Sequence, residues 1–154
     1  MSMEDSLDNL KTYFTAGLEA QLVTIETARS VTIPRWTDLD TGFVMSLQYP
    51  NISIVPASTA VDYGEAGTLV EPWYDDNISV LIEHKGSVQK DVQYVILRYV
   101  EALTALIIAD YTCGNRVDIT QIFAVDYSLI DAREAKSFRQ VTDLQLLVRE
   151  YRSN

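Results

Sequence analysis

The chain is short of the residues on which most metal sites and disulfide-bonded folds depend. Its 154 residues include one cysteine, Cys113, and one histidine, His84. A single cysteine forms no internal disulfide, and one cysteine with one histidine falls short of the several ligands of a usual zinc site. A disulfide-stapled fold and a Cys/His zinc centre are therefore excluded, and a reducing compartment fits the composition.

Glycine and proline are also scarce, at six and four residues. With 47% hydrophobic residues and a length near the commonest domain size, this composition predicts one folded domain over residues 1–154. The few glycines form no phosphate-binding loop and no nucleophile elbow, and there is no HExxH pair. The usual sequence support for a nucleotide-binding protein, a serine hydrolase or a zinc protease is missing, so we expect no enzyme and no cofactor.

Basic residues are few and unevenly placed. Residues 1–111 hold 16 acids and 6 bases, which accounts for the whole net charge of −10, whereas residues 112–154 hold 6 of each. A net-acidic surface repels nucleic acid phosphates and argues against binding DNA by charge neutralisation. The same surface suits a passage through which DNA slides without sticking.

No segment has the pattern of an export signal or a membrane anchor. The amino-terminal MSMEDSLDNL lacks a basic start followed by an apolar run, so no signal peptide is expected there. The longest apolar stretch is interrupted by Arg98 and Glu101, and the remainder is short for a bilayer span. We therefore predict a soluble protein with no membrane partner.

Two amphipathic helices are predicted from apolar residues that recur at three- and four-residue intervals. The first covers about residues 4–28. The second follows the strand that ends near Gly86, spans roughly 33 Å and ends at Gly114, which supplies the left-handed residue. The buried stripes are Leu7, Leu10, Phe14, Leu18, Leu22 and Ile25 in the first helix, and Val92, Val95, Ile96, Tyr99, Leu103, Leu106 and Ile107 in the second.

Short strands are predicted where apolar and polar residues alternate. They cover 43–47, 52–54 up to Pro56, 78–82 ending near Gly86, 119–127 and 144–148, and residues 128–136 connect the last two. On the fourth of these strands, one face is expected to carry Ile119, Gln121, Phe123, Val125 and Tyr127. This order predicts a single α+β domain in which two helices cover an antiparallel or mixed β-sheet.

The last strand-like run is unusually long. As one continuous strand, residues 138–152 would extend roughly 50 Å, well beyond the usual five or six residues. A strand that overshoots its own domain leaves backbone donors and acceptors unpaired, and these are matched by bulges, by bends or by a second copy of the chain. The candidate residues for contact between subunits are Phe138, Arg139, Arg149 and Arg152.

Residues 57–77 show no clear period and are predicted to form a long acidic loop. It contains five acids and no base: Asp62, Glu65, Glu71, Asp75 and Asp76. Loops of this length are unusual in compact domains, and exposed aromatic residues are favoured at protein interfaces. Trp73 and Tyr74 are thus candidate partner contacts, with packing back over the sheet as the other reading.

Three further candidates are interpreted structurally. His84 has no nucleophile to pair with, so we expect a structural or solvent-facing histidine. The TDLDTG segment resembles a calcium loop, but the twelfth position is Tyr49 instead of a bidentate acid, which favours an Asp-rich turn. Cys113 lacks a base that would activate it and is expected to be a buried small residue near a helix end.

The size of the chain, the order of its elements and three stretches of sequence resemble the tail-completion, or tail-terminator, proteins of tailed bacteriophages. The stretches are YPNISIVP early in the sheet, the helix before Gly114, and AVDYSLIDAREAKSFRQVTDLQLLVREYR at the end. The likeness covers nearly the whole chain and lies in architecture and general texture, without an invariant signature.

The resemblance implies a structural protein of the virion tail or neck, which assembles in the host cytoplasm. Such proteins form a homo-oligomeric ring, commonly a hexamer, that caps the tail tube protein, ends tail polymerisation and joins the tail to a head connector or adaptor protein. DNA passes through the ring without specific binding. In such a ring, we predict that the acids of residues 57–77 face the central passage, with a solvated outer loop as the other interpretation.

Two other classes stay open. One is another neck or head-completion connector protein of a phage. The other is a small-molecule-binding α+β domain that uses a cavity between sheet and helices, with Asp110 and Gln121 as its inward polar groups.

Overall fold

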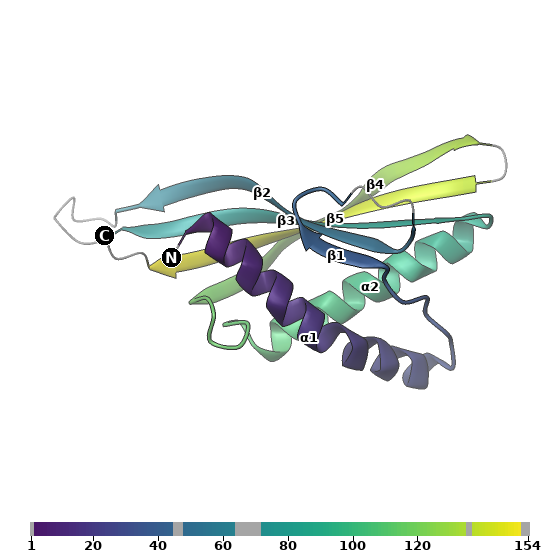
Figure 1. Ribbon diagram of the computed structural model, residues 1–154, viewed down its shortest axis with the longest axis horizontal. Helices are drawn as coiled ribbons and strands as arrows, with labels where there is room; N and C mark the ends of the chain where they lie inside the picture. The colour runs from purple at the N-terminus through teal and green to yellow at the C-terminus, as the bar shows by residue number, and fades with distance from the viewer. Residues whose placement is uncertain (1, 45–47, 64–71, 135–136, 152–154) are drawn as a thin grey trace.

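The computed structural model describes residues 2–44, 48–63, 72–134 and 137–151. Two helices and five strands follow one another in the order α1, β1, β2, β3, α2, β4, β5 (Figure 1). Their bounds are α1 Met3–Arg29, β1 Asp38–Thr41, β2 Asn51–Asp62, β3 Trp73–Gly86, α2 Gln89–Ala109, β4 Ile119–Glu134 and β5 Ser137–Tyr151.

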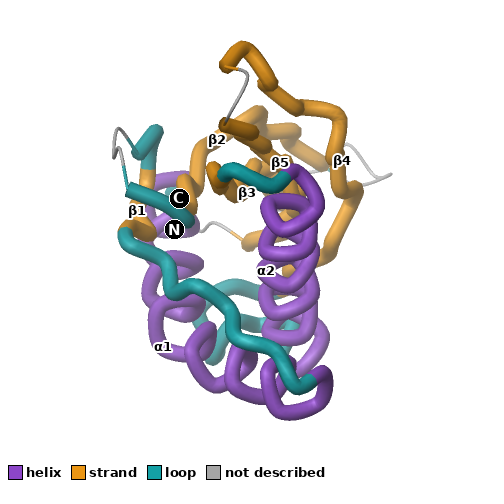
Figure 2. The backbone as a smooth tube through the Cα atoms, turned by 90° about the vertical axis from the view of Figure 1, so that its right-hand side faces the viewer, coloured by secondary structure: helices purple, strands orange, loops and turns teal. Residues whose placement is uncertain are grey.

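The strands form one mixed sheet in the order β1-β2-β3-β5-β4. β1 pairs with β2 in parallel, and the other three pairings are antiparallel. Both helices lie on one face of this sheet, and the other face carries no helix among the described residues (Figure 2). The predicted α+β class, with two helices covering a mixed sheet, is confirmed.

Helix α1 begins and ends at residues suited to those positions. At its start the Ser2 side chain accepts from the backbone N–H of Asp5, and the Asp5 carboxylate accepts from the backbone N–H of Ser2, which forms a capping box. At its end Ser30 adopts a left-handed conformation with φ of 52°. The residues buried on α1 match the predicted stripe except for Leu7, which is partly buried.

Helix α2 also confirms the predicted stripe, but its end differs from the prediction. It stops at Ala109, with Asp110 as its extended cap residue. Gly114 does have a positive φ of 76°, yet it lies in the following turn, where Cys113 and Asn115 are left-handed as well. Three such residues so close together form a tight turn, so Gly114 serves this turn instead of the helix cap.

By length and composition alone, α2 is long and apolar enough to cross a membrane. An 18-residue window of it has a mean hydropathy of 1.6, so the expectation that this stretch is too short for a span is wrong by that measure. Half of the window is buried within the protein, and its buried side chains belong to the cluster that α2 shares with α1 and the sheet. The apolar character of α2 is therefore accounted for by core packing.

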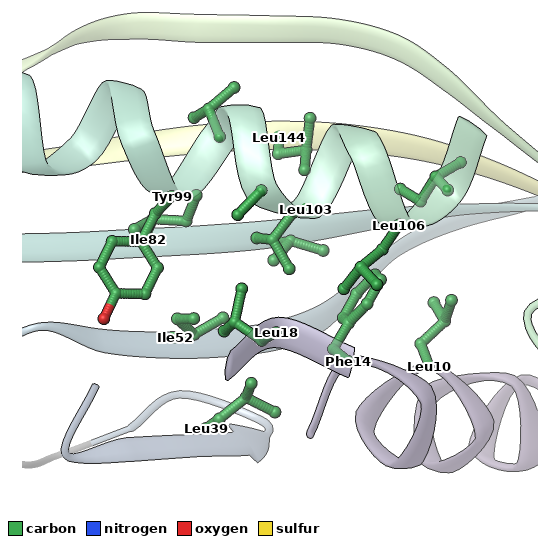
Figure 3. Packing of buried hydrophobic residues seen from close by; sticks show 14 of the residues in the cluster. Leu10, Phe14, Leu18, Leu39, Ile52, Ile82, Tyr99, Leu103, Leu106 and Leu144 are labelled. Atoms are coloured by element: carbon green, nitrogen blue, oxygen red, sulfur yellow. The ribbon is translucent and has the colours of Figure 1, made fainter. Parts of the chain in front are cut away.

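The core lies between the helices and the covered face of the sheet (Figure 3). Phe14, Leu18, Tyr99 and Leu103 are fully buried there. The Tyr99 hydroxyl donates to the carbonyl of Pro34 at 2.6 Å, so the polar end of this large ring is satisfied. Side chains of both helices and all three long inner strands thus contribute to one continuous core.

The helices approach closely where Gly17 of α1 faces Leu106 of α2. A Cβ atom on Gly17 would lie 2.5 Å from the Leu106 Cδ2 atom. Nearby, the Tyr13 hydroxyl donates to the Leu106 carbonyl at 2.7 Å. The missing side chain at position 17 therefore sets how near the two helices can pack.

The predicted acidic loop over residues 57–77 is wrong at both ends. β2 continues past Pro56 to Asp62, and β3 begins at Trp73, so the two strands pair along most of this region. Pro56 is accommodated beside a register shift between Pro56 and Ser58. Residues 64–71, which include Glu65 and Glu71, lie outside the described residues.

Two other strand predictions also need correction. The first strand is Asp38–Thr41 instead of 43–47, and residues 45–47 lie outside the described residues. The predicted connection over 128–136 is largely strand, because β4 runs to Glu134. Both strands were predicted wrongly because their extent is set by pairing with other strands. β1 pairs with β2 and β4 pairs with β5, and this pairing overrides the local sequence pattern.

β5 is as long as predicted but is not an edge strand. Each residue of β3 pairs with a residue of β5, and β4 pairs with the opposite side of β5. Its length is therefore matched within one chain, and the reasoning that it leaves groups free for a neighbour is wrong. The outer strands of the sheet are β1, which covers only Asn51–Ile54 of β2, and β4.

β4 does not present one continuous face as predicted. Its pairing with β5 shifts between Ile122 and Ala124, so Ile122 and Val125 both pack toward the core although they are three residues apart. Phe123 is left at the irregularity and is 72% exposed. A bulge of this kind, which the sequence pattern does not reveal, turns an aromatic side chain outward.

Candidate interaction surfaces

An ion-pair cluster lies on the open face of the sheet, near the end where β2 and β3 are joined. Arg149 of β5 donates from Nε and Nη2 to the two carboxylate oxygens of Asp75 at 2.7 and 2.8 Å, and its Nη2 atom lies 3.8 Å from Asp62. The register aligns Asp75 with Arg149 directly across β3 and β5. Arg149, predicted to contact a neighbouring subunit, thus has acidic partners in its own chain.

This pairing changes how the acids should be interpreted. The hydrogen bonds from Arg149 lower the pKa of Asp75 below its usual range. Residues 57–77 contain no base in the sequence, but the base comes from a strand more than seventy residues away in the chain. Local charge counting could not find it.

Asp76 differs from the other acids because it is fully buried on the covered face. Its Oδ1 atom accepts from the Thr59 hydroxyl at 2.7 Å, and its Oδ2 atom lies 3.4 Å from the Ser6 hydroxyl. The same Ser6 hydroxyl donates to the fully buried Glu150 at 2.7 Å. These contacts tie the first turn of α1 to β3 and β5, so Asp76 is a structural residue and cannot line a passage.

The two candidate aromatics lie on β3 instead of a loop and point to opposite faces. Trp73 is 40% exposed, whereas Tyr74 is half-buried on the side of Asp76 and Glu150. Neighbouring strand residues alternate between faces, so they cannot form one patch. Trp73 is the accessible member of the pair, and Tyr74 fits the alternative of packing against the fold.

The remaining predicted subunit contacts lie at the other end of β5. Phe138 is half-buried opposite Gly86, and Arg139 is exposed and paired with Glu83 of β3. Arg152 lies outside the described residues. The structure therefore separates Arg139 from Arg149 by most of the length of the sheet.

In the part of the chain that the structure describes, the fold does not bring His84 or Cys113 into a catalytic arrangement. Burial lowers the pKa of His84, and its Nδ1 atom is buried without a hydrogen-bond partner, as is the Oε1 atom of Gln140 directly opposite on β5. Cys113 is buried as predicted, with its pKa raised by burial. Among the described residues, no three His, Cys, Asp or Glu side chains gather as a metal site.

The aspartates of TDLDTG also have structural roles. Asp40 accepts from the Lys11 ammonium at 2.7 Å and from the backbone N–H of Thr41. Asp38 and Asp40 belong to β1, so a strand replaces the predicted turn. The Asp40 carboxylate is thus neutralised by Lys11 of α1, and no calcium ion is needed to balance its charge.

The described residues line several hollows, and one of these includes a polar residue proposed for a ligand cavity. A hollow of about 390 Å³ lies on the open face between Ser58, Asn77, Phe123 and Gln145. Another, of about 440 Å³, is lined by Thr32, His84, Asp91, Tyr94 and Arg98, among others. A third, of about 130 Å³, is lined by Ile119, Gln121, Leu147 and Arg149, and Gln121 is exposed there. Asp110 instead accepts hydrogen bonds within the turn after α2.

Three exposed large apolar residues lie along β4. Ile119, Phe123 and Tyr127 are 44%, 72% and 40% exposed, whereas β2 and β3 each have one, Val61 at 43% and Trp73 at 40%. The three residues of β4 were assigned to this strand from the sequence, but nothing in the pattern distinguished them as exposed. Apolar side chains gathered along one edge strand are typical of a contact surface.

No protein-family model and no curated protein matches the chain. The function must therefore be argued from the residues and the geometry described above.

Replacing Arg149 should change how stability depends on pH. Asp75 has a depressed pKa in the folded protein, so its pairing stabilises the fold above the unfolded-state value near 3.9 and is lost as the pH falls through the lower folded value. Arg149→Met should cost about 0.5–1 kcal/mol at neutral pH and flatten the acid limb of a plot of unfolding free energy against pH.

Arg29→Met provides the matched control, because the Arg29–Glu101 pair at 2.6 Å is about half-exposed at both ends. It should lower the free energy of unfolding at neutral pH by less than Arg149→Met does. Equal effects of the two substitutions would show that the Asp75 pairing has no special role in stability.

Proposed function

We propose that the chain is a structural virion protein that forms a ring, commonly of six copies, at the end of a phage tail tube. The ring would end tube polymerisation and join the tail to the head connector. The observation that carries the proposal is the exposed apolar edge at Ile119, Phe123 and Tyr127, on a sheet that extends away from the helices (Figure 1). Such an edge suits contact between proteins better than it suits catalysis.

The net negative charge of the chain also supports this proposal, although fewer acids of residues 57–77 are exposed than the sequence predicted. Asp76 is buried and Asp75 is paired with Arg149, so among the described acids of residues 57–77 only Asp62 is exposed. The net charge of −10 per copy nevertheless makes each subunit repel DNA phosphates. A ring of such subunits would let DNA pass without holding it where the acid-rich residues 1–111 line the passage.

The proposal predicts that the purified protein forms rings and shortens tail tubes. Tube protein polymerised with and without the chain would be imaged by negative-stain electron microscopy, and tube lengths and end structures would be scored. We expect capped tubes of limited length.

Trp73→Ala should weaken capping with little change in melting temperature, since an exposed aromatic at an interface often contributes about 2 kcal/mol to binding.

Rings that bind a connector protein but leave tube length unchanged would point to another neck or head-completion component. A protein that stays monomeric and leaves tubes uncapped would contradict the proposal. The hollow beside His84 and Arg98 would then favour a small-molecule-binding domain, which a ligand-induced rise in melting temperature would reveal.

A further inference from the structure

Each of the two edges of the sheet includes a strand segment without charged residues. On one side, β4 carries no charged residue from Ile119 to Val125, and its first charge is Asp126. On the other side, β2 carries none from Asn51 to Val61. Native proteins commonly protect edge strands with charged side chains, so two uncharged edges in a chain of net charge −10 are unexpected for a monomer.

The β2 edge is open over only part of its length. β1 pairs with Asn51–Ile54 and then ends, and no other described strand pairs with the outer side of residues 57–61. All five of these residues are exposed. They are small or β-branched, with the sequence ASTAV, so another strand can approach this edge closely.

The β4 edge offers both backbone groups and apolar side chains. Its first residues are engaged, since the Thr120 N–H donates to the Tyr111 carbonyl at 2.8 Å. Beyond that point, Phe123 and Tyr127 are exposed next to register shifts at Ile122/Ala124 and Asp126/Leu129. These shifts limit a new ladder to a few residues, so the aromatic side chains would provide much of the contact.

We propose that copies of this chain join head to tail, with the β4 edge around Phe123 and Tyr127 of one copy pairing with residues 57–61 of β2 in the next. Because β1 occupies the edge beside Asn51–Ile54, the part of β4 beyond Tyr127 would have to leave this edge at the register shift between Asp126 and Leu129. This inference rests on the proposed ring and identifies the surfaces that would build it.

Strand directions are consistent with this pairing. Each of the pairs β2–β3, β3–β5 and β5–β4 is antiparallel, so β2 and β4 run in opposite directions. A neighbour that continues the sheet therefore places its β2 antiparallel to β4. Because the two contact surfaces differ, the association is heterologous, and it closes into a ring when the rotation between copies divides a full turn.

Charge favours these edges over the rest of the surface. Copies that each carry −10 repel one another, and contact between uncharged edges keeps the acids apart. We therefore assign a second copy of the chain as the occupant of each edge, because the chain itself carries the edge with which the other one pairs.

The test uses one substitution on each edge. Phe123→Lys and Ala60→Lys each place a charge on an exposed residue and should weaken self-association about tenfold or more, measured by analytical ultracentrifugation. Lysine lowers the net negative charge, so general repulsion between copies cannot cause the loss. Ala20→Lys, on the exposed side of α1, is the control and should associate like the unmodified chain.

Mixing the two edge variants gives a sharper result. Phe123→Lys keeps an intact β2 edge and Ala60→Lys keeps an intact β4 edge. At concentrations just high enough for the unmodified chain to associate, each variant alone should be monomeric, and the equimolar mixture should form one-to-one dimers and nothing larger. Unchanged circular dichroism spectra and melting temperatures would confirm that both variants are folded.

Several outcomes would overturn the inference. They are a monomeric unmodified chain at every soluble concentration, full-size assemblies from either variant, or a mixture that associates no better than its components. Loss of association in Phe123→Lys alone would indicate two-fold contact between β4 edges instead. Rings that survive both substitutions would leave the proposed function intact, whereas edge-paired rings that fail to cap tubes would contradict that function and leave this inference standing.

Discussion

Phe14→Ala is expected to lower the free energy of unfolding by about 3–5 kcal/mol. Phe14 is fully buried, and its ring lies between α1 and α2 close to Leu10 and Leu106 (Figure 3). Its removal deletes apolar contacts and leaves a cavity that two helices and a sheet cannot readily close. Domains of this size are stable by about 5–15 kcal/mol, so the variant should be partly unfolded near physiological temperature.

Urea denaturation followed by circular dichroism would measure this loss, with Thr15→Ala as the control. Thr15 is exposed on the same turn of α1, and its replacement should change stability only slightly. A loss below about 1 kcal/mol for Phe14→Ala would mean that the contact between α1 and α2 is much looser than described.

Gly17→Leu is expected to lower the free energy of unfolding by about 1–3 kcal/mol or more. Even a Cβ atom at this position meets Leu106 at 2.5 Å, and the larger side chain would force the helices apart. Leu106→Ala alone should cost about 2–5 kcal/mol because it opens a cavity at the same place.

Combining Gly17→Leu with Leu106→Ala exchanges a small and a large residue across the same contact. The double variant should be more stable than the sum of the two losses predicts, by at least about 1 kcal/mol in a double-mutant cycle. Additive losses would indicate that Gly17 is needed for a reason other than the approach of Leu106.

The helices could be predicted closely from the sequence because their burial follows a local period. Leu10, Phe14 and Leu18 recur at the spacing of one helix face, and capping by Ser2 and Asp5 is also local. The inner strands were recognised for a similar reason, since Ile78, Val80 and Ile82 alternate with less buried residues. Local pattern, however, does not specify where a strand ends.

The errors occurred where distant residues decide the structure. Pro56 was interpreted as the end of a strand, but pairing with β3 carries β2 past it. The acids near residue 75 were interpreted as part of an acidic loop because their partners, Arg149, Thr59 and Ser6, come from other elements. Likewise, the bulge that exposes Phe123 depends on its register with β5, which the pattern of β4 alone does not contain.

The placement of β5 has a consequence for how the chain folds during synthesis. β5 is the last strand to be made, yet it lies between β3 and β4 and pairs with both along most of its length. Until residues 137–151 leave the ribosome, the whole inner side of β3 has no partner strand, and β4 has none at all. Most of the sheet therefore forms late through contacts distant in sequence, and a nascent chain that stalls before β5 exposes a long strand edge prone to aggregation.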